Sequence, residues 1–159
     1  MDQTKLLANR IQEVFINGKW IANTNYKDQL SELNWEQATK KIGALNTIAA
    51  LTFHVNYYIG GILNFLENGK LEIKDKYSFD MPLITTERDW KKLRHSLMQN
   101  AEKFAQLVEV WPDEKLDEVF VLPKYGTYQR NIEGLIEHSY YHLGQISLIN
   151  KLIKTHFKL

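Results

Sequence analysis

Two histidines in the last part of the chain occupy positions where a helical core would normally carry aliphatic residues. The apolar residues Leu135, Ile146 and Ile149 recur at helical spacing, and the same rhythm passes through His138 and His142. Side chains four residues apart lie one above the other on one face of a helix. An unpaired polar nitrogen in a core costs about 1–3 kcal/mol. A divalent metal ion is therefore a well-suited partner for this pair.

A third histidine, His54, falls on a separate apolar pattern near the middle of residues 42–67. His138 and His142 flank the middle of residues 127–155. Midpoints of aligned bundle helices share one level, so we expect the three imidazoles to meet in one layer. Three neutral imidazoles leave a coordination position open on a metal, which is typical of catalytic sites. Such a metal lowers the pKa of bound water to about 7, or holds a thiol as its thiolate.

Several other kinds of active site are excluded by the sequence. Ser139 follows His138, whereas a zincin helix needs glutamate at that position. No histidine has a glutamate three residues before it, which excludes the paired motif of di-iron carboxylate bundles. The chain also has no phosphate-binding glycine loop, no G-x-S-x-G elbow and no cysteine. Thiolate ligands, disulfides and a cysteine nucleophile are therefore impossible.

Apolar periodicity predicts four long helices that bring the histidines into place. Their expected ranges are 2–16, 34–68, 86–111 and 127–155. Asn34 and Gln37 have the spacing of a capping box at the start of the second helix. Gly69 supplies its left-handed end. Thr86 is expected to begin the third helix and Thr127 to cap the fourth.

The segments between these helices are expected to be connections of unequal length. We interpret residues 19–33 as a loop over one end of the domain. Residues 70–85 can reach about 50 Å when extended, whereas a 25-residue helix is only about 38 Å long. This connection can therefore place the third helix parallel to the second. Residues 113–126 form a second crossover, in which Val119–Leu122 is expected as a short strand or a packed loop.

Composition favours one all-α domain that covers residues 1–159. The chain is 44% hydrophobic, which suffices for a core, and its net charge of +1 gives no argument for nucleic acid or an anionic membrane as a partner. The N-terminus lacks the regions of a signal peptide, and no apolar run approaches the roughly 20 residues of a membrane span. We expect a soluble, cytoplasmic protein that is a monomer or a homodimer.

The histidine pattern resembles the DinB-like superfamily of metalloenzymes. The resemblance is carried by His54 together with His138-x-x-x-His142-x-Gly144-Gln145, and extends to the helix lengths and long connections. It implies a four-helix bundle of up-down-down-up topology with long connections between helices two and three and between three and four. It also implies one divalent metal ion (zinc, nickel, iron or manganese) held by the three histidines and completed by water. Relatives in the superfamily include thiol-dependent S-transferases and a thiol-dependent isomerase.

These observations support three functional hypotheses. The first is a metal-dependent enzyme that hydrolyses a small molecule or transfers a low-molecular-weight thiol to an electrophile, the thiol being implied by the resemblance alone. The second is a non-catalytic bundle that binds a metal or a small ligand. The third is a protein that binds a partner through exposed apolar faces, in which the histidines have no present role.

Side chains near the three histidines have both a functional and a structural interpretation. Gln145, one turn from His142, either supports the metal site or bonds across helices. Tyr58, one turn beyond His54, either places its hydroxyl near the metal or fills the core. His95 is expected on the solvated surface, and His156 is expected to have no functional role.

Overall fold

The computed structural model describes residues 2–156, and all named secondary-structure elements in that range are helices. The longer helices are α1 (Gln3–Gln12), α4 (Ile48–Asn68), α5 (Glu87–Glu109) and α6 (Tyr128–His156). Short elements are α2 (Tyr26–Ser31), α3 (Trp35–Ala38), a π-helical turn (Glu13–Asn17) and three 3-10 turns (Asp75–Tyr77, Asp113–Asp117, Pro123–Tyr125). The predicted all-α class is confirmed. One domain over 1–159 stays a prediction, since residues 1 and 157–159 lie outside the described range.

Several helix ends follow the capping signals in the sequence. The Thr86 hydroxyl accepts a hydrogen bond from the Asp89 N–H, and the Asp89 carboxylate accepts one from the Thr86 N–H, which completes a capping box before α5. The Thr127 hydroxyl accepts from the Arg130 N–H at the start of α6. Gly69 ends α4 with a φ of 73°. These three boundaries were predicted correctly.

The predicted start of the second long helix at Asn34 is wrong. The capping box of Asn34 and Gln37 is present, but it begins the four-residue helix α3. The chain then leaves helical geometry, and Gly43 takes a φ of 52°. Helix α4 begins at Ile48, where the Thr47 hydroxyl accepts from the Ala50 N–H. A good cap started a helix that the following residues did not continue.

The interpretation of residues 19–33 as a loop is also wrong in part. Helix α2 lies inside that segment, and Asn25 caps it by accepting from the Asp28 N–H. Tyr26 is fully buried, with its ring 4.9 Å from that of Phe15. Tyr26, Leu30 and Leu33 have helical spacing and are all buried, a signal in the sequence that the interpretation as a loop overlooked.

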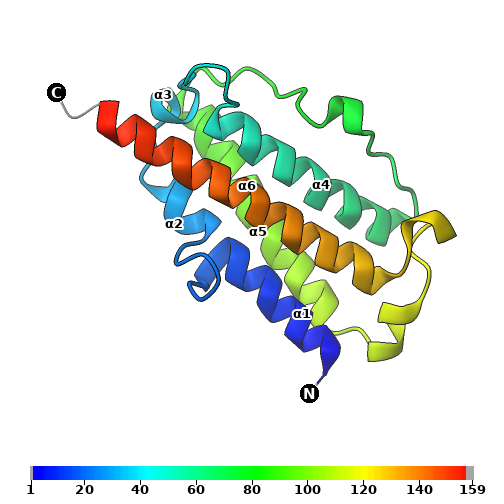
Figure 1. The fold of residues 1–159 in the computed structure, drawn as a ribbon. Helices are drawn as coiled ribbons and strands as arrows, with labels where there is room; N and C mark the ends of the chain where they lie inside the picture. The colour runs from blue at the N-terminus through cyan, green and yellow to red at the C-terminus, as the bar shows by residue number, and fades with distance from the viewer. Residues whose placement is uncertain (1, 157–159) are drawn as a thin grey trace.

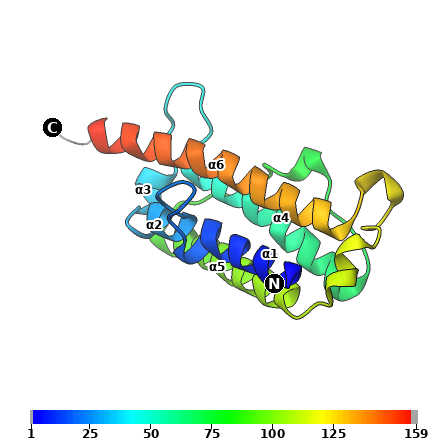
Figure 2. The ribbon, with the colours of Figure 1, turned by 60° about the horizontal axis from the view of Figure 1, so that its bottom comes forward.

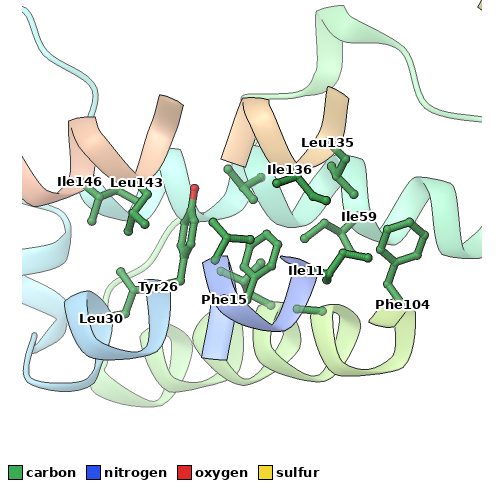
Figure 3. Close-up of a cluster of buried hydrophobic side chains, with 14 of the residues drawn as sticks. Ile11, Phe15, Tyr26, Leu30, Ile59, Phe104, Leu135, Ile136, Leu143 and Ile146 are labelled. Carbon is green, nitrogen blue, oxygen red and sulfur yellow. The ribbon is translucent and has the colours of Figure 1, made fainter. Parts of the chain in front are cut away.

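The four longer helices lie side by side. Helix α1 packs along α5, and α4 contacts both α5 and α6. Figure 1 places the starts of α4 and α5 at the same end of the molecule, close to α3, with the connection between them running back along its length. Figure 2 shows α4 and α6 on one side and α1 and α5 on the other. Buried side chains from all four helices meet between these two sides (Figure 3).

Both long connections are packed against the helices. In the first, Ile73 fills the space that a side chain at Gly61 would need, so this glycine permits the close approach. In the second, an isolated bridge joins Val119 to Thr127, and the described residues contain no longer strand there. Val119–Leu122 is therefore a loop rather than a strand, in which Phe120 is buried while Val119 and Leu122 are about half exposed. None of the described helices combines the length and apolar character that crossing a membrane requires.

Candidate metal centre

Three histidines from two helices converge on one point. The Nε2 atom of His138 lies 3.1 Å from Nε2 of His54 and 3.0 Å from Nε2 of His142. One nitrogen from each residue lies within 4.8 Å of the others. His54 comes from the second turn of α4, and His138 and His142 from successive turns of α6. The three residues lie close enough to hold a single metal ion.

These separations suit a shared cation. Imidazole nitrogens bind zinc at about 2.0–2.1 Å, so two ligands of one ion at tetrahedral angles lie about 3.3–3.4 Å apart. The two Nε2 separations at His138, 3.1 and 3.0 Å, are slightly shorter, so the rings need to move apart by only a few tenths of an ångström to hold an ion. None of the three rings stacks on another: the planes of His138 and His142 are inclined by 84°, those of His54 and His142 by 77°, and those of His54 and His138 by 54°.

The outer nitrogens of two histidines have fixed hydrogen-bond partners. Nδ1 of His54 lies 3.2 Å from the Ser78 carbonyl oxygen, and Nδ1 of His142 lies 2.7 Å from Oε1 of Gln145. A carbonyl oxygen only accepts, so each Nδ1 carries the hydrogen. In the neutral rings, both Nε2 lone pairs then point at the meeting place. A bound cation satisfies these lone pairs, whereas the single ring hydrogen of His138 can satisfy only one.

The surroundings hold all three imidazoles in their neutral form. Burial lowers the pKa of His138 to about 4, and the neighbouring His142 and His54 add to this shift. Burial also lowers the pKa of His54, with a further contribution from His142, while its hydrogen bond to Ser78 opposes the shift. The pKa of His142 is lowered by burial and partly restored by Gln145. Metal binding requires neutral imidazole, so the site is prepared for it at neutral pH.

Tyr26 anchors the backbone of α6 between its two histidines. The Tyr26 hydroxyl donates to the Ser139 carbonyl oxygen at 2.8 Å, and burial raises the pKa of this hydroxyl well above its usual value. Ser139 is itself fully buried, and its hydroxyl donates to the Leu135 carbonyl at 2.6 Å. A large side chain at Ser139 would collide with this packing. The residue that replaces a zincin glutamate therefore has a structural role.

The connection between α4 and α5 forms one wall of the site. Phe79 stacks on the His54 ring, with centroids 4.1 Å apart and planes inclined by 13°. The Tyr57 hydroxyl holds this connection to α4 through the backbone N–H and carbonyl of Lys74, at 2.9 and 3.1 Å. The position of His54 thus depends on a segment that has no regular structure around residues 78–79.

Tyr58 lies beside the histidines, with its hydroxyl directed to Asp75. Its ring centroid is 5.1 Å from that of His54 and 5.3 Å from that of His138. The hydroxyl donates to Oδ1 of Asp75 at 2.9 Å. Burial raises the pKa of Tyr58, and the hydrogen bond to Asp75 raises it further. Tyr58 is therefore a neutral hydroxyl at the edge of the site at physiological pH.

A solvent-open cleft with a volume of about 480 Å³ adjoins His138. Residues from α4, α6 and the turn before α6 line it. They are Tyr58, Ile62, Lys124, Tyr125, Arg130, Asn131, Gly134, Leu135 and His138. A small molecule in this cleft would reach the edge of the group of three nitrogens. Pockets of this size are large enough for a metabolite.

The structure brings together the site residues that the sequence predicted. His54, His138 and His142 meet, Gln145 bonds to His142, and Tyr58 lies at the edge. His54 is not at the middle of its helix, because α4 begins at Ile48; the expected convergence occurs even though that premise was wrong.

Other residues around the site were missed, and some predictions concern residues away from it. Ser78, Phe79 and Asp75 lie in a segment without periodicity, so no sequence signal pointed to them. Tyr26 could have been found, because it has helical spacing with Leu30 and Leu33 after the capping residue Asn25. His95 is exposed, as expected, and the side chain of His156 lies outside the described part of the chain.

Comparison with known proteins identifies no relative of this chain. No family model, no curated protein sequence and no solved structure matches it. The resemblance to the DinB-like superfamily therefore depends on the histidine pattern and the helix lengths alone. Any functional conclusion has to come from the site itself.

Proposed function

We propose that this chain is a divalent-metal-dependent enzyme that acts on a small molecule, and that His54, His138 and His142 hold the metal. One observation carries the proposal: one ring nitrogen of each of the three histidines lies within 4.8 Å of the others, next to an open cleft. A purely structural zinc site is usually closed by four protein ligands, whereas catalytic sites commonly have three and an open position.

We further propose that the fold is the up-down-down-up four-helix bundle that the resemblance implies. Two observations support this topology. Helices α4 and α5 start at the same end of the molecule in Figure 1, and a connection of about the length of a helix joins them. Helices α1 and α6 would then be the two members that run in the opposite direction. In such bundles, side chains on facing helices build metal sites in the core.

Each residue of the site has a distinct task in this proposal. The three imidazoles hold the ion, while the Ser78 carbonyl and the Gln145 amide fix two of the rings in the required tautomer. A divalent ion bound there would supply Lewis acidity and lower the pKa of a coordinated water or thiol. The Tyr58 hydroxyl can donate a hydrogen bond to a substrate in the cleft, in exchange for its bond to Asp75.

The reaction class is hydrolysis of a small molecule or transfer of a low-molecular-weight thiol to an electrophile. Both reactions begin with a nucleophile that must lose a proton at neutral pH. Asp75 is the nearest carboxylate connected to the site, through the Tyr58 hydroxyl, and is the candidate to receive that proton. The thiol reaction follows from the DinB-like resemblance, and hydrolysis follows from the three-histidine donor set. We propose a monomer or a homodimer, which light scattering can distinguish.

The proposal is tested by activity after reconstitution with defined metals. Metal-free protein would be loaded with zinc, nickel, iron or manganese and assayed with ester and amide panels, and with small thiols against electrophiles. We expect turnover with at least one metal, and a loss of at least about 100-fold in His138→Ala, because that variant lacks one of three ligands. His95→Ala is the matched control. Turnover that is equal in His138→Ala and the parent protein would contradict the proposal.

A second candidate function is metal binding without catalysis. The observation that favours it is the donor set: among the described residues, the group around the ion consists of three histidines with no carboxylate. In that case the metal stabilises the fold, and the cleft is incidental. Water relaxation of the manganese-loaded protein separates the two candidates. Rapid exchange of solvent at the ion supports the enzyme, and an ion closed to solvent supports the structural role.

A further inference from the structure

We propose that the cleft beside the three histidines binds a small dicarboxylate-type anion, with one carboxylate held by Arg130 and Lys124 and the opposite end directed at the histidines. This inference rests on the proposed function, because it assigns a substrate class to the same site. It is drawn from the charge of the cleft, from its floor on α6 and from the distance between its two ends.

The charge of the cleft is positive. Among its lining residues, Lys124 and Arg130 are cationic and none is acidic. The first turn of α6 contributes Arg130 and Asn131, so the positive end of the helix dipole lies at the same place. Asp75 lies beyond Tyr58 and accepts its hydroxyl hydrogen. An anion would therefore be favoured near the two cations.

Both cations are available to a ligand. Nη1 of Arg130 lies 3.2 Å from Oε2 of Glu137, and these side chains are 63% and 61% exposed. An ion pair this exposed contributes only about 0–1 kcal/mol, so a carboxylate in the cleft can replace Glu137. Nζ of Lys124 lies 4.9 Å from the Tyr125 ring centroid, and none of the ion pairs among the described residues involves it.

The turn that carries Lys124 is fixed to α6. Nδ2 of Asn131 donates to the carbonyl oxygens of Tyr125 and Thr127, both at 2.8 Å. The bridge between Val119 and Thr127 holds the other side of this turn. Because the turn is already ordered, closing on an anion costs little conformational entropy.

Gly134 forms the floor between the cations and the histidines. Arg130, Gly134 and His138 follow one another at intervals of four residues, so they share one face of α6. A glycine inside a helix costs about 1 kcal/mol relative to alanine. Nη1 of Arg130 would lie 3.7 Å from a Cβ atom at Gly134, so its guanidinium lies over the glycine. The missing side chain leaves room for a ligand between Arg130 and His138.

The spacing limits the size of the ligand. Gly134 and His138 are one helical turn apart, which is about 5.4 Å. Since the guanidinium lies over Gly134, only a small anion fits between it and the histidines. Glutarate, a small dicarboxylate, is a representative probe.

Calorimetric titration of glutarate into zinc-loaded and metal-free protein tests the proposal. Pentanoate, in which a methyl group replaces one carboxylate, is the matched ligand control. We expect glutarate to bind zinc-loaded protein at least about 10-fold more tightly than pentanoate. Arg130→Gln should weaken glutarate binding by about 10-fold or more, since a hydrogen bond to a charged group is lost, and Lys124→Gln by a smaller factor.

Two further variants separate charge from shape. Gly134→Leu leaves every charge in place but fills the floor of the cleft, so it should weaken glutarate binding at least about 10-fold. Glu137→Gln removes the carboxylate that competes for Arg130, and should leave binding equal or tighten it a few-fold. These positions are exposed or line an open cleft, and circular dichroism would verify that each variant folds.

The outcomes distinguish this inference from the proposed function. If zinc binds but glutarate affinity is the same in Arg130→Gln, or the same as for pentanoate, the anion site is wrong and the metal site stands. If zinc does not bind, the proposed function fails. Binding of glutarate to metal-free protein that is lost in Arg130→Gln would then support the anion site alone, and binding insensitive to that variant would overturn it.

Discussion

The two sides of this helical protein solve the problem of filling a core in different ways. Where α1 packs along α5, the interior is formed by Ile11, Phe15, Leu97 and Phe104, each exposed by 1% or less. Where α4 faces α6, three histidines occupy the corresponding inward positions, and they contact one another through nitrogen atoms. The first side is stable because apolar surface leaves water. On the second side, imidazole nitrogens lie in the interior. The hydrogen bonds of Nδ1 in His54 and His142 orient these rings so that their Nε2 atoms point inward.

The difference separates the part of the molecule that provides stability from the part that provides chemistry. Apolar packing needs only matching volumes, which side chains of the helices supply. The histidine side needs particular groups from outside the four longer helices as well: the Ser78 carbonyl and the Phe79 ring come from the connection between α4 and α5, and the Tyr26 hydroxyl comes from the short helix α2. The short segments therefore shape the site, while the long helices position its three principal residues.

The largest expected effect on stability comes from a substitution in the apolar core between α1 and α5. Phe104→Ala should lower the free energy of unfolding by about 3–5 kcal/mol, because it leaves a cavity among fully buried side chains. Phe79→Ala, at the histidine site, should cost much less, since that ring is 45% exposed. Urea denaturation of metal-free protein measures both. Equal losses in the two variants would contradict the division between the two sides.

Metal removal should lower the free energy of unfolding only when the histidine site is intact. At a free zinc concentration 100 times its Kd, binding to the folded chain should raise the free energy of unfolding by about 2.7 kcal/mol. This gain should vanish in His142→Ala and persist in Phe104→Leu. Thermal unfolding with and without a chelator provides the measurement. A zinc effect that survives in His142→Ala would place the ion somewhere else.

Removing the Gln145 amide, which orients His142, should have a smaller effect on metal binding. Gln145→Ala removes the acceptor 2.7 Å from Nδ1 of His142 and should weaken metal affinity by about 10–100-fold. Gln129→Ala is the matched control, because Gln129 bonds to Glu133 on the same helix, away from the histidines. Competition with a chromophoric chelator reports both affinities. If the two variants lose equal affinity, the bond to Gln145 is only structural.

A further effect concerns the pH dependence of the metal-free protein. The pKa of His138 falls from 6.5 to about 4 in the folded chain. Between these values the unfolded chain binds more protons, so stability should decrease as the pH falls from 6.5 towards 4 and stay level above 6.5. His138→Asn should flatten this dependence, and His95→Asn should not. An unchanged slope in His138→Asn, measured by urea denaturation at several pH values, would contradict the pKa shift.

The parts of the fold with local signals were predictable from the sequence. Thr86, Thr127 and Gly69 mark helix ends through side-chain and backbone preferences that act within a few residues. His138 and His142 were predictable because a four-residue interval fixes a shared helical face. His54 was predicted to lie near them because it falls on the apolar face of another expected helix. All-helical structure followed from the same periodicity.

The parts set by tertiary packing were not predictable. Asn34 and Thr47 both carry good capping signals, and only the path of the chain around Gly43 decides that the long helix begins after Thr47. Tyr26 has helical spacing with Leu30 and Leu33, which predicts an inward face but not its position beside α6. Phe79 lies in a segment where no periodicity distinguishes an inward from an outward side chain. The contacts of both residues with the histidine site depend on how the connections fold back, which local preferences do not encode.

The most direct test is the metal content of protein purified without a histidine tag. After dialysis against a dilute mixture of zinc, nickel, iron and manganese, mass spectrometry should find about one divalent ion per chain, because the three histidines lie close enough to hold a single ion. His54→Ala, His138→Ala and His142→Ala should each retain less than about a tenth of that amount, and His95→Ala should retain all of it. A metal-free parent protein, or histidine variants that keep their ion, would contradict the account.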